Sequence, residues 1–194
     1  MSKYGIFNNK NKETLVFYPC PKNANSSAKL FFIKHLGLEN EYIFLSDDIP
    51  RYKQTKTDLG LKKNIVDFLP TKQPFKKIKA DIKCCIVRDP IERFLSSYKN
   101  RILFHKDKEF FNHTIDMVLS KLENQIFENL HFLPQSYFLG DNLKYFDFYS
   151  NVKNIELFQD RVNDFFGKKI IFPKIQTGGN EEHIILNNSQ IKKI

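Results

Sequence analysis

The chain has 194 residues, a formal net charge of +9, and 41% hydrophobic and 14% aromatic residues. This length and composition are typical of one folded domain with a sizeable core, which we place at residues 1–194. No apolar run reaches the roughly 18 residues that a membrane span needs, and the N-terminus lacks the apolar core of a signal peptide. The three cysteines, Cys20, Cys84 and Cys85, form no disulfide framework, so we expect small buried thiols and a reducing compartment.

The positive charge is concentrated between Arg51 and Lys79, where nine Lys and Arg residues accompany two acidic ones. Such a basic segment favours a polyanionic partner: nucleic acid, an anionic membrane surface or an anionic substrate. It is equally typical of a solvated surface loop. Only three aromatic residues for base stacking, Tyr52, Phe68 and Phe75, lie within the segment.

The N-terminal part of the chain predicts a strand, a loop and a helix. Residues 1–13 are polar and predict an irregular or edge segment. The apolar run at 14–19 predicts a buried strand. A helix then begins at Ser26 or Ser27, either of which can cap it, and ends at Gly37.

A short strand at 42–45 leads into the basic segment, in which we expect a weak helix at about 61–69. Residues 82–87 predict a strand that is nearly all apolar at its end, as in a parallel sheet covered on both faces. Asp89 and Pro90 suit the N-cap and the first position of the next helix. Its inner face is expected to carry Ile91, Phe94, Leu95, Tyr98 and Ile102, and its other side Arg93, Ser96, Ser97 and Asn100.

The remaining elements follow the same alternation. In chain order they are a helix at 114–124, a loop at 131–135, a strand at 145–149, a helix at 155–166 ended by Gly167, a strand at 170–172, a turn at 177–180 and the start of a helix after Leu186. Because strands alternate with helices, we predict an α/β fold of three layers with a central, mostly parallel sheet.

Two of the predicted strand-to-helix turns carry positive charge: Lys22 follows the first strand and Arg88 follows the strand at 82–87. Backbone N–H groups and the helix dipole make such turns anion sites, although each alone is also typical of an ordinary loop. In an open parallel sheet both lie at the carboxyl edge, where ligands bind. Two anion sites on one edge suit a ligand with two phosphates, and Ser96, about two helical turns after Arg88, can share one of them.

These residues resemble a known family. Arg88-Asp-Pro-Ile-Glu-Arg-Phe-Leu-Ser96 resembles the 3′-phosphate-binding motif of sulfotransferases, and Pro21-Lys-Asn-Ala-Asn-Ser-Ser27 is similar to their 5′-phosphosulfate loop. The stretch His131-Phe-Leu-Pro-Gln135, with 146–149 and 154–156, resembles the carbohydrate (Golgi-type) sulfotransferases and their bacterial and viral relatives. The resemblance covers roughly residues 14–166 in the same order.

The resemblance implies a fold related to P-loop kinases, and an enzyme that moves a sulfuryl group from PAPS (3′-phosphoadenosine 5′-phosphosulfate) to a hydroxyl of a carbohydrate-type acceptor. Lys22 would neutralise the departing phosphate oxygen. Arg88 and Ser96 would hold the 3′ phosphate. The 5′ phosphate would be held by Lys22, Asn23, Ala24, Asn25, Ser26 and Ser27. No metal is needed, and the sequence has no His, Cys and Asp cluster with ligand spacing.

The general base implied by the resemblance is His131, with His105, His113 and Glu92 as alternatives. A lone histidine is also typical of a structural or exposed position. The family loop often carries Gly where Asn25 stands, so we expect Asn25 to be left-handed or the loop to be stiffer.

The membrane anchor and paired cysteines of the Golgi enzymes are missing, which predicts a soluble cytoplasmic enzyme that uses no membrane and no nucleic acid. Family members usually continue past the C-terminus seen here, so we expect either a naturally short chain or a truncated one.

Two other functions stay open. The first is a nucleotide-dependent small-molecule kinase on the same fold, against which the missing Gly-x-x-x-x-Gly-Lys-[Ser/Thr] loop argues. The second is a non-catalytic basic protein that binds nucleic acid through residues 51–79. Under the sulfotransferase hypothesis the same segment contacts an anionic acceptor or covers the donor.

Overall fold

The computed structural model describes residues 4–39, 42–44, 50–52, 73–110, 112–124, 129–175 and 182–194, with the backbone alone at 42–44 and 50–52. The helix predicted at 61–69, the turn predicted at 177–180 and most of the basic segment lie outside these residues. Within the described part of the chain, no helix has both the length and the apolar character that crossing a bilayer requires.

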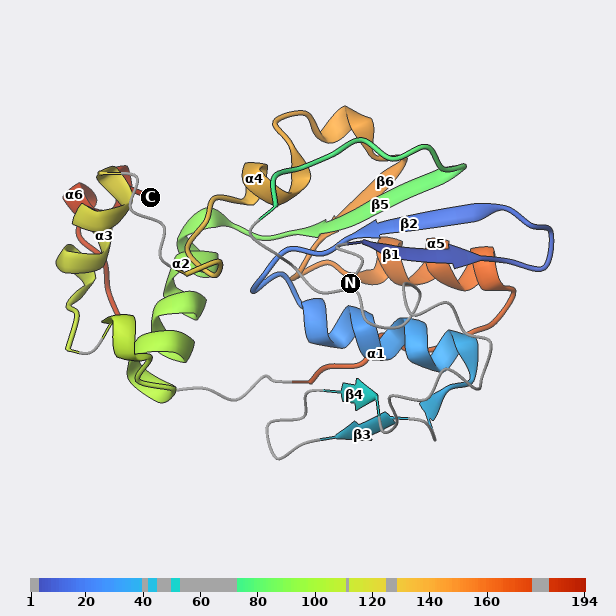
Figure 1. The fold of residues 1–194 in the computed structure, drawn as a ribbon, viewed down its shortest axis with the longest axis horizontal. Helices are drawn as coiled ribbons and strands as arrows, with labels where there is room; N and C mark the ends of the chain where they lie inside the picture. The colour runs from blue at the N-terminus through green and yellow to red at the C-terminus, as the bar shows by residue number, and fades with distance from the viewer. Residues whose placement is uncertain are drawn as a thin grey trace.

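A four-stranded sheet with the order β1-β2-β5-β6 lies at the centre of the fold (Figure 1). β2 (Thr14–Tyr18) pairs in parallel with β5 (Ile82–Val87), and β5 pairs in parallel with β6 (Phe148–Asn151). β1 (Gly5–Asn8) runs antiparallel to β2 at the edge of the sheet. The prediction of a mostly parallel sheet is confirmed, and the segment predicted to be irregular or an edge contributes an edge strand.

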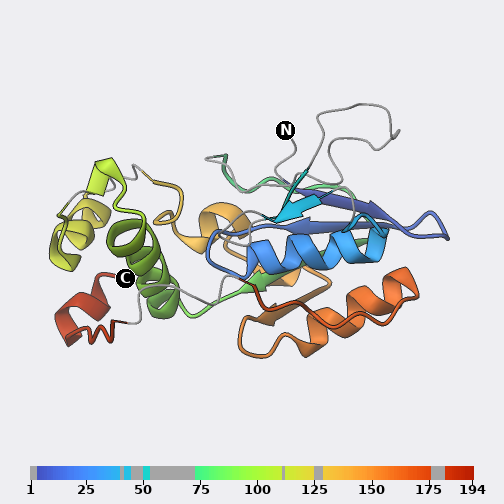
Figure 2. The same cartoon turned by 90° about the horizontal axis from the view of Figure 1, so that it is seen from below.

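One face of the sheet is covered by α1 (Asn25–Leu36) and α5 (Glu156–Phe166), which lie side by side (Figure 2). Both helices end at a glycine, Gly37 at φ 69° and Gly167 at φ 64°, as their sequences predict. Large apolar side chains bury this face. They include Phe7, Leu15, Phe17, Phe31, Phe32, Ile86, Phe158 and Val162.

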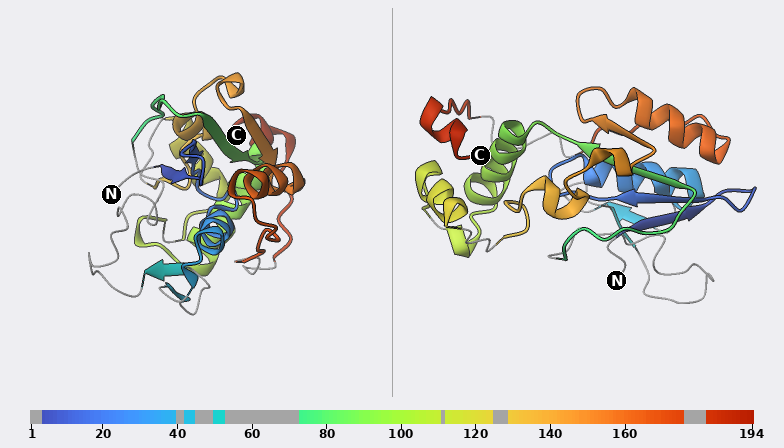
Figure 3. Two further views of the ribbon diagram at one scale, coloured as in Figure 1. Left: turned by 90° about the vertical axis from the view of Figure 1, so that its right-hand side faces the viewer. Right: turned by 90° about the horizontal axis from the view of Figure 1, so that it is seen from above.

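The other face is covered by α4 (Gln135–Leu139), a 3₁₀ turn at Leu143–Tyr145 and the extended segment 73–80, which completes three layers (Figure 3). The hydroxyl groups of Tyr18 and Tyr145 lie 2.7 Å apart, and the Ile78 N–H donates to both, at 3.1 and 2.8 Å. This phenol pair holds the extended segment against the sheet.

A second group of helices lies beyond the carboxyl end of β5 (Figure 1). α2 (Pro90–Tyr98) continues into a π-helical turn at Lys99–Phe104 and packs with α3 (Ile115–Glu123). α6 (Asn188–Lys192) lies beside α3, where Gln190 Nε2 donates to Asp116 Oδ1 at 2.9 Å, and its flanking residues Leu186 and Ile194 join the packing. The helices predicted at the start of α2, at α3 and near the C-terminus are confirmed. Their shared core contains Phe94, Tyr98, Ile102, Phe110, Val118, Leu119, Phe132 and Leu186.

The strand prediction at 170–172 is wrong. The Phe172 N–H donates to Gln159 Oε1 at 2.8 Å and the Ile170 N–H donates to Asn163 Oδ1 at 3.1 Å, so side chains of α5 take the bonds that a neighbouring strand would take. The strand predicted at 145–149 begins only at Phe148, because the preceding residues form the 3₁₀ turn.

The strand predicted at 42–45 is present as β3 (Tyr42–Phe44), but it pairs with β4 (Pro50–Tyr52) in a separate two-stranded sheet rather than in the central one. The three cysteines are buried and form no disulfide, as predicted.

Candidate functional site

The loop of residues 19–24 connects the carboxyl end of β2 to α1. Its backbone turns sharply because Lys22 and Ala24 take left-handed φ values of 67° and 54°, which residues with a Cβ adopt only at an energetic cost. No side chain of the described residues caps α1, and the first turn of the helix contains no acid. The helix start therefore presents backbone N–H groups and a positive dipole end, which suit an anion.

The prediction that Ser26 or Ser27 caps this helix is wrong, because Ala24 holds the N-cap position and both serines lie inside α1. The Ser27 hydroxyl instead accepts from the Ile175 N–H at 3.2 Å. The left-handed conformation predicted for Asn25 belongs to Ala24, and Asn25 is the first helical residue. Within the described residues, the buried Oδ1 of Asn25 has no hydrogen-bond partner.

The turn after β5 brings Arg88 to the same loop. Its Nη1 donates to the carbonyl oxygen of Lys22 at 3.0 Å. Asp89 caps α2 by accepting from the Glu92 N–H at 3.0 Å, and Pro90 is the first helical residue, as predicted. Burial lowers the pKa of Arg88, while Glu92 Oε2 lies 4.0 Å from its Nε and acts in the opposite sense. The two predicted anion turns are therefore in direct contact.

Ser96 lies half-buried on α2. Among the described residues, no hydrogen bond joins it to Arg88, so their joint role stays a prediction. The next residue, Ser97, is fully buried, and its hydroxyl donates to the carbonyl oxygen of His131 at 2.9 Å. The expectation that Arg93 and Ser97 lie on the outer side of this helix is wrong, because both are buried.

Arg93 links the anion loop to the loop that contains His131. Its Nε donates to the carbonyl oxygen of Pro21 at 2.9 Å, and its Nη1 donates to that of Leu133 at 2.8 Å. Among the described residues, its buried Nη2 has no partner. A guanidinium with one unused nitrogen, held beside the anion loop, adds positive charge that the sequence did not assign to the site.

Gln135, the last residue of the His-Phe-Leu-Pro-Gln stretch, joins both turns. Its Nε2 donates to the carbonyl oxygen of Arg88 at 2.7 Å, and its Oε1 accepts from the Arg88 N–H at 3.0 Å. The same oxygen accepts from Asn23 Nδ2 at 2.7 Å. All three stretches that carry the resemblance are therefore bonded to one another.

His131 lies before α4 with its Nδ1 2.7 Å from Asn129 Oδ1. That oxygen also accepts from the His131 N–H at 3.0 Å, so it is an acceptor, and the ring carries its proton on Nδ1 and its lone pair on Nε2. Burial, and then the charges of Arg101, Lys22 and Arg93, lower the pKa of His131 to about 3. The imidazole is therefore neutral at pH 7.

The three alternative bases occupy other surroundings. His105 is exposed. His113 is half-buried, and its carbonyl oxygen accepts from the Tyr98 hydroxyl at 3.0 Å. Glu92 forms an ion pair with Lys153 in addition to its approach to Arg88. The charges of Lys22, Arg93 and Arg101 act on His131, and those of Arg93 and Arg101 also act on Lys22, so His131 and Lys22 share cationic surroundings.

Lys22 is the most strongly perturbed cation of the site. Burial lowers its pKa from 10.5 to about 8, and the positive charges of Arg88, Arg101 and Arg93 act in the same direction. No carboxylate of the described residues pairs with its ammonium group. Arg101, by contrast, is neutralised by Asp107 through hydrogen bonds of 2.6 and 2.7 Å. The arrangement therefore holds an excess of positive charge that an anionic ligand would relieve.

Sequence reasoning assigned no role to Arg93, Arg101, Gln135 or Asn129. For two of them the sequence contained a signal, since both lie within the stretches that resemble the family. Arg93 lies in the motif that begins at Arg88, and Gln135 is the last residue of the stretch that begins at His131. Arg101 lies in the π-helical turn that follows α2 and Asn129 lies before α4, and nothing in their local pattern predicts proximity to Lys22.

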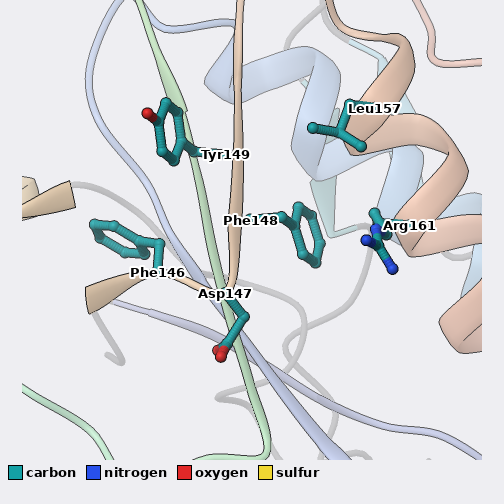
Figure 4. A pocket seen from close by; sticks show the side chains of 6 residues that line it. All are labelled: Phe146, Asp147, Phe148, Tyr149, Leu157 and Arg161. Atoms are coloured by element: carbon teal, nitrogen blue, oxygen red, sulfur yellow. The ribbon is translucent and has the colours of Figure 1, made fainter. Parts of the chain in front are cut away.

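A surface pocket of about 410 Å³ lies elsewhere, along β6 and the start of α5 (Figure 4). Its lining residues are Phe146, Asp147, Phe148, Tyr149, Leu157 and Arg161. It contains none of the predicted site residues. Across the described residues, no group of three His, Cys, Asp or Glu side chains is arranged to hold a metal ion.

Comparison with known proteins identifies one family. The model of the sulfotransferase family matches residues 6–177, which include both anion turns and the histidine stretch. No curated protein and no solved structure matches the chain. Because the family model covers most of the chain, this protein belongs to the sulfotransferase family, whose members transfer sulfuryl groups.

Proposed function

We propose that the protein transfers a sulfuryl group from PAPS to a hydroxyl of a carbohydrate-type acceptor by in-line displacement. The observation that carries the proposal is the contact between the two anion turns, in which Arg88 donates to the carbonyl oxygen of Lys22. Two cationic turns at one sheet edge suit a donor that has phosphate groups at both its 3′ and 5′ positions. The resemblance of residues 131–135 to carbohydrate sulfotransferases supports a sugar acceptor.

The residues of the first turn fit the 5′ end of this donor. The loop from Lys22 to Ser27 supplies backbone N–H groups and the N-terminus of α1, as the phosphate loop does in P-loop kinases. The side-chain amide of Asn23 and the hydroxyl of Ser27 are bonded within the protein. The Asn23 N–H also donates to the carbonyl oxygen of Cys20 at 3.2 Å, so we assign Asn23 a role in shaping the loop and Ser27 a backbone contribution. Ala24 contributes only backbone, and Asn25 and Ser26 add polar side chains at the helix start.

At the other end, Arg88 and Ser96 are proposed to hold the 3′ phosphate. A guanidinium group suits bidentate contact with phosphate oxygens. Nη1 of Arg88 already donates to the carbonyl oxygen of Lys22, and this bond orients the guanidinium plane relative to the loop. The unpartnered Nη2 of Arg93 is a further donor at the same edge.

Lys22 is proposed to stabilise the negative charge that develops on the departing phosphate oxygen. With a pKa of about 8 it is mostly protonated at pH 7, and an anion beside it raises that pKa. His131 is proposed to accept the proton of the acceptor hydroxyl at Nε2. The same anion offsets the charges of Arg101 and Lys22, so it raises the pKa of His131 from about 3 and makes it a better base.

The donor site is tested by calorimetry with adenosine 3′,5′-bisphosphate, the desulfated donor, against ATP. We expect the bisphosphate to bind more tightly, with the 3′ phosphate providing the gain. Arg88→Ala should weaken this binding, whereas Lys22→Ala should reduce turnover far more than binding, by about 10²–10³-fold. Turnover is measured as label transfer from PAPS to a panel of neutral and anionic oligosaccharides.

Two outcomes would reject the proposal in favour of the alternatives. Equal binding of ATP, with magnesium-dependent ATP turnover, would indicate a kinase. Steeply salt-dependent binding of DNA or RNA without any binding of the bisphosphate would indicate a nucleic-acid-binding protein. The three cysteines, Cys20, Cys84 and Cys85, are buried and form no disulfide, which supports a reducing compartment, and we propose a cytoplasmic location.

A further inference from the structure

Gln135 occupies an unusual position between the two anion turns. Its amide makes three hydrogen bonds, two to the backbone of Arg88 and one to the side chain of Asn23. Asn23 is 1% exposed, and its Nδ2 also donates to the carbonyl oxygen of Ile86 at 2.8 Å. The Gln135 side chain thus connects Arg88, which follows β5, to Asn23, which follows Lys22.

The orientation of both amides is fixed by their partners. A backbone N–H and a backbone carbonyl of the same residue, Arg88, select the oxygen and nitrogen of Gln135. The Ile86 carbonyl selects the nitrogen of Asn23, and the Gln135 oxygen accepts from that nitrogen. These bonds hold both amides in a single orientation, with the buried Oδ1 of Asn23 left without a hydrogen-bond partner among the described residues. Displacement of either turn would break bonds of the Gln135 amide and leave further buried polar groups unpaired.

We infer that Gln135 is a positioning residue that sets the separation and orientation of the two anion turns, so that one ligand with two phosphates occupies both. The inference rests on the proposed function, because it assigns the two turns to the two ends of one donor. Gln135 itself contacts the protein backbone and Asn23 and is not assigned a contact with the ligand.

The physical consequence concerns a ligand that is held at two points. Once one phosphate is bound, the second binds as an intramolecular event whose effective concentration depends on how well the distance between the half-sites matches the ligand. When the Gln135 bonds are lost, each anion turn still has its own cation, Lys22 in the first turn and Arg88 in the second. A loss of the Gln135 bonds should therefore reduce the gain from carrying both phosphates more than it reduces binding of either phosphate alone.

The test compares three probes by calorimetry: adenosine 3′,5′-bisphosphate, adenosine 5′-monophosphate and adenosine 3′-monophosphate. The variants are Gln135→Ala and Gln135→Met, the second of which keeps the length of the side chain. Gln159→Ala is the matched control, since Gln159 also holds a backbone N–H, that of Phe172, in α5 away from the site. Thermal unfolding of each variant establishes that it is folded.

We expect the advantage of the bisphosphate over the monophosphates to fall at least tenfold in both Gln135 variants, while binding of each monophosphate changes less than threefold. Gln159→Ala should keep the full advantage. Retention of the advantage in both Gln135 variants would overturn the inference, as would an equal loss for all three probes or an equal loss in the control. A wild-type protein that shows no advantage for the bisphosphate would instead overturn the proposed function.

Discussion

Replacing Lys22 with methionine should stabilise the folded protein. The Lys22 ammonium lies half-buried among the charges of Arg88, Arg101 and Arg93, and its pKa falls from 10.5 to about 8. Methionine keeps a similar shape without the charge. Because methionine also has a Cβ, the cost of the left-handed φ of 67° is the same in both proteins. The substitution therefore isolates the charge.

The magnitude follows from the displacement of the pKa. A change from 10.5 to about 8 corresponds to at most ~3.4 kcal/mol at 1.36 kcal/mol per pKa unit. Water still reaches part of the side chain and screens its neighbours, so we expect roughly 1–2 kcal/mol. For a chain of this length, 1 kcal/mol shifts the melting temperature by about 2–4 °C. Lys22→Met should therefore raise Tm by about 2–8 °C at pH 7.

The pH dependence has a defined sign. The folded-state pKa of Lys22 is below its unfolded value, so between pH 8 and 10.5 the unfolded chain binds more protons and the wild-type protein gains stability as pH rises. The variant lacks this gain. Its advantage should be full below pH 8 and should disappear by about pH 10.5.

Calorimetric or fluorescence melting of both proteins from pH 6 to 10 measures this difference. Lys10→Met is the control, since Lys10 is exposed in a turn and its replacement should leave Tm nearly unchanged. If Lys22→Met melts at or below the wild-type temperature at pH 7 while the control is neutral, the cations do not gather around Lys22 as the structure shows, and the electrostatic argument for the anion site fails.

Two further predictions concern the same loops. Ala24→Gly should stabilise the protein by about 0.5–1 kcal/mol, because glycine adopts φ 54° without strain and is a better N-cap than alanine. Urea titration measures this change, and a loss of stability would show that the left-handed turn is not formed. His131→Gln should lower sulfuryl transfer by about 10²–10⁴-fold with the bisphosphate dissociation constant within threefold of wild type, measured by label transfer and calorimetry. Retained turnover would exclude His131 as the base.

The sequence predicted those parts of the fold that depend on local patterns. α2, α3 and α5 follow from helical periodicity, with Asp89 and Pro90 at the start of α2 and Gly167 at the end of α5. α1 follows from an apolar segment that ends at Gly37, and β2 and β5 follow from apolar runs. The strand at 170–172 failed for a reason that is not local, because α5 supplies its backbone partners through Gln159 and Asn163. Hydrophobicity indicated burial of Phe172 but not how its backbone is bonded.

For the site, the sequence predicted the two turns and their cations but not the residues that connect them. Arg93 was assigned to the outer side of its helix because it falls outside the helical spacing of the apolar residues. It is buried here because two carbonyl groups, from loops before and after α2 in the sequence, accept from its guanidinium. Such a role depends on tertiary packing and has no signal in the spacing of residues along one helix.

The loop from residue 19 to 24 concentrates features that a folding chain otherwise avoids: two left-handed residues with side chains, a helix start without a side-chain cap and a half-buried cation without an acidic partner among the described residues. A left-handed lysine alone signals little. Lys12 takes φ 66° in an exposed turn, where Asn9 Oδ1 accepts from the N–H groups of Asn11 and Glu13, so its backbone is satisfied locally. At Lys22 the preceding residue is Pro21, which has no N–H, and the Asn23 N–H donates to the carbonyl oxygen of Cys20 at 3.2 Å, whereas the ammonium group has no acidic partner among the described residues. Local rules broken together at one place are typical of a functional site, and here they favour an anion as the partner independently of the family match.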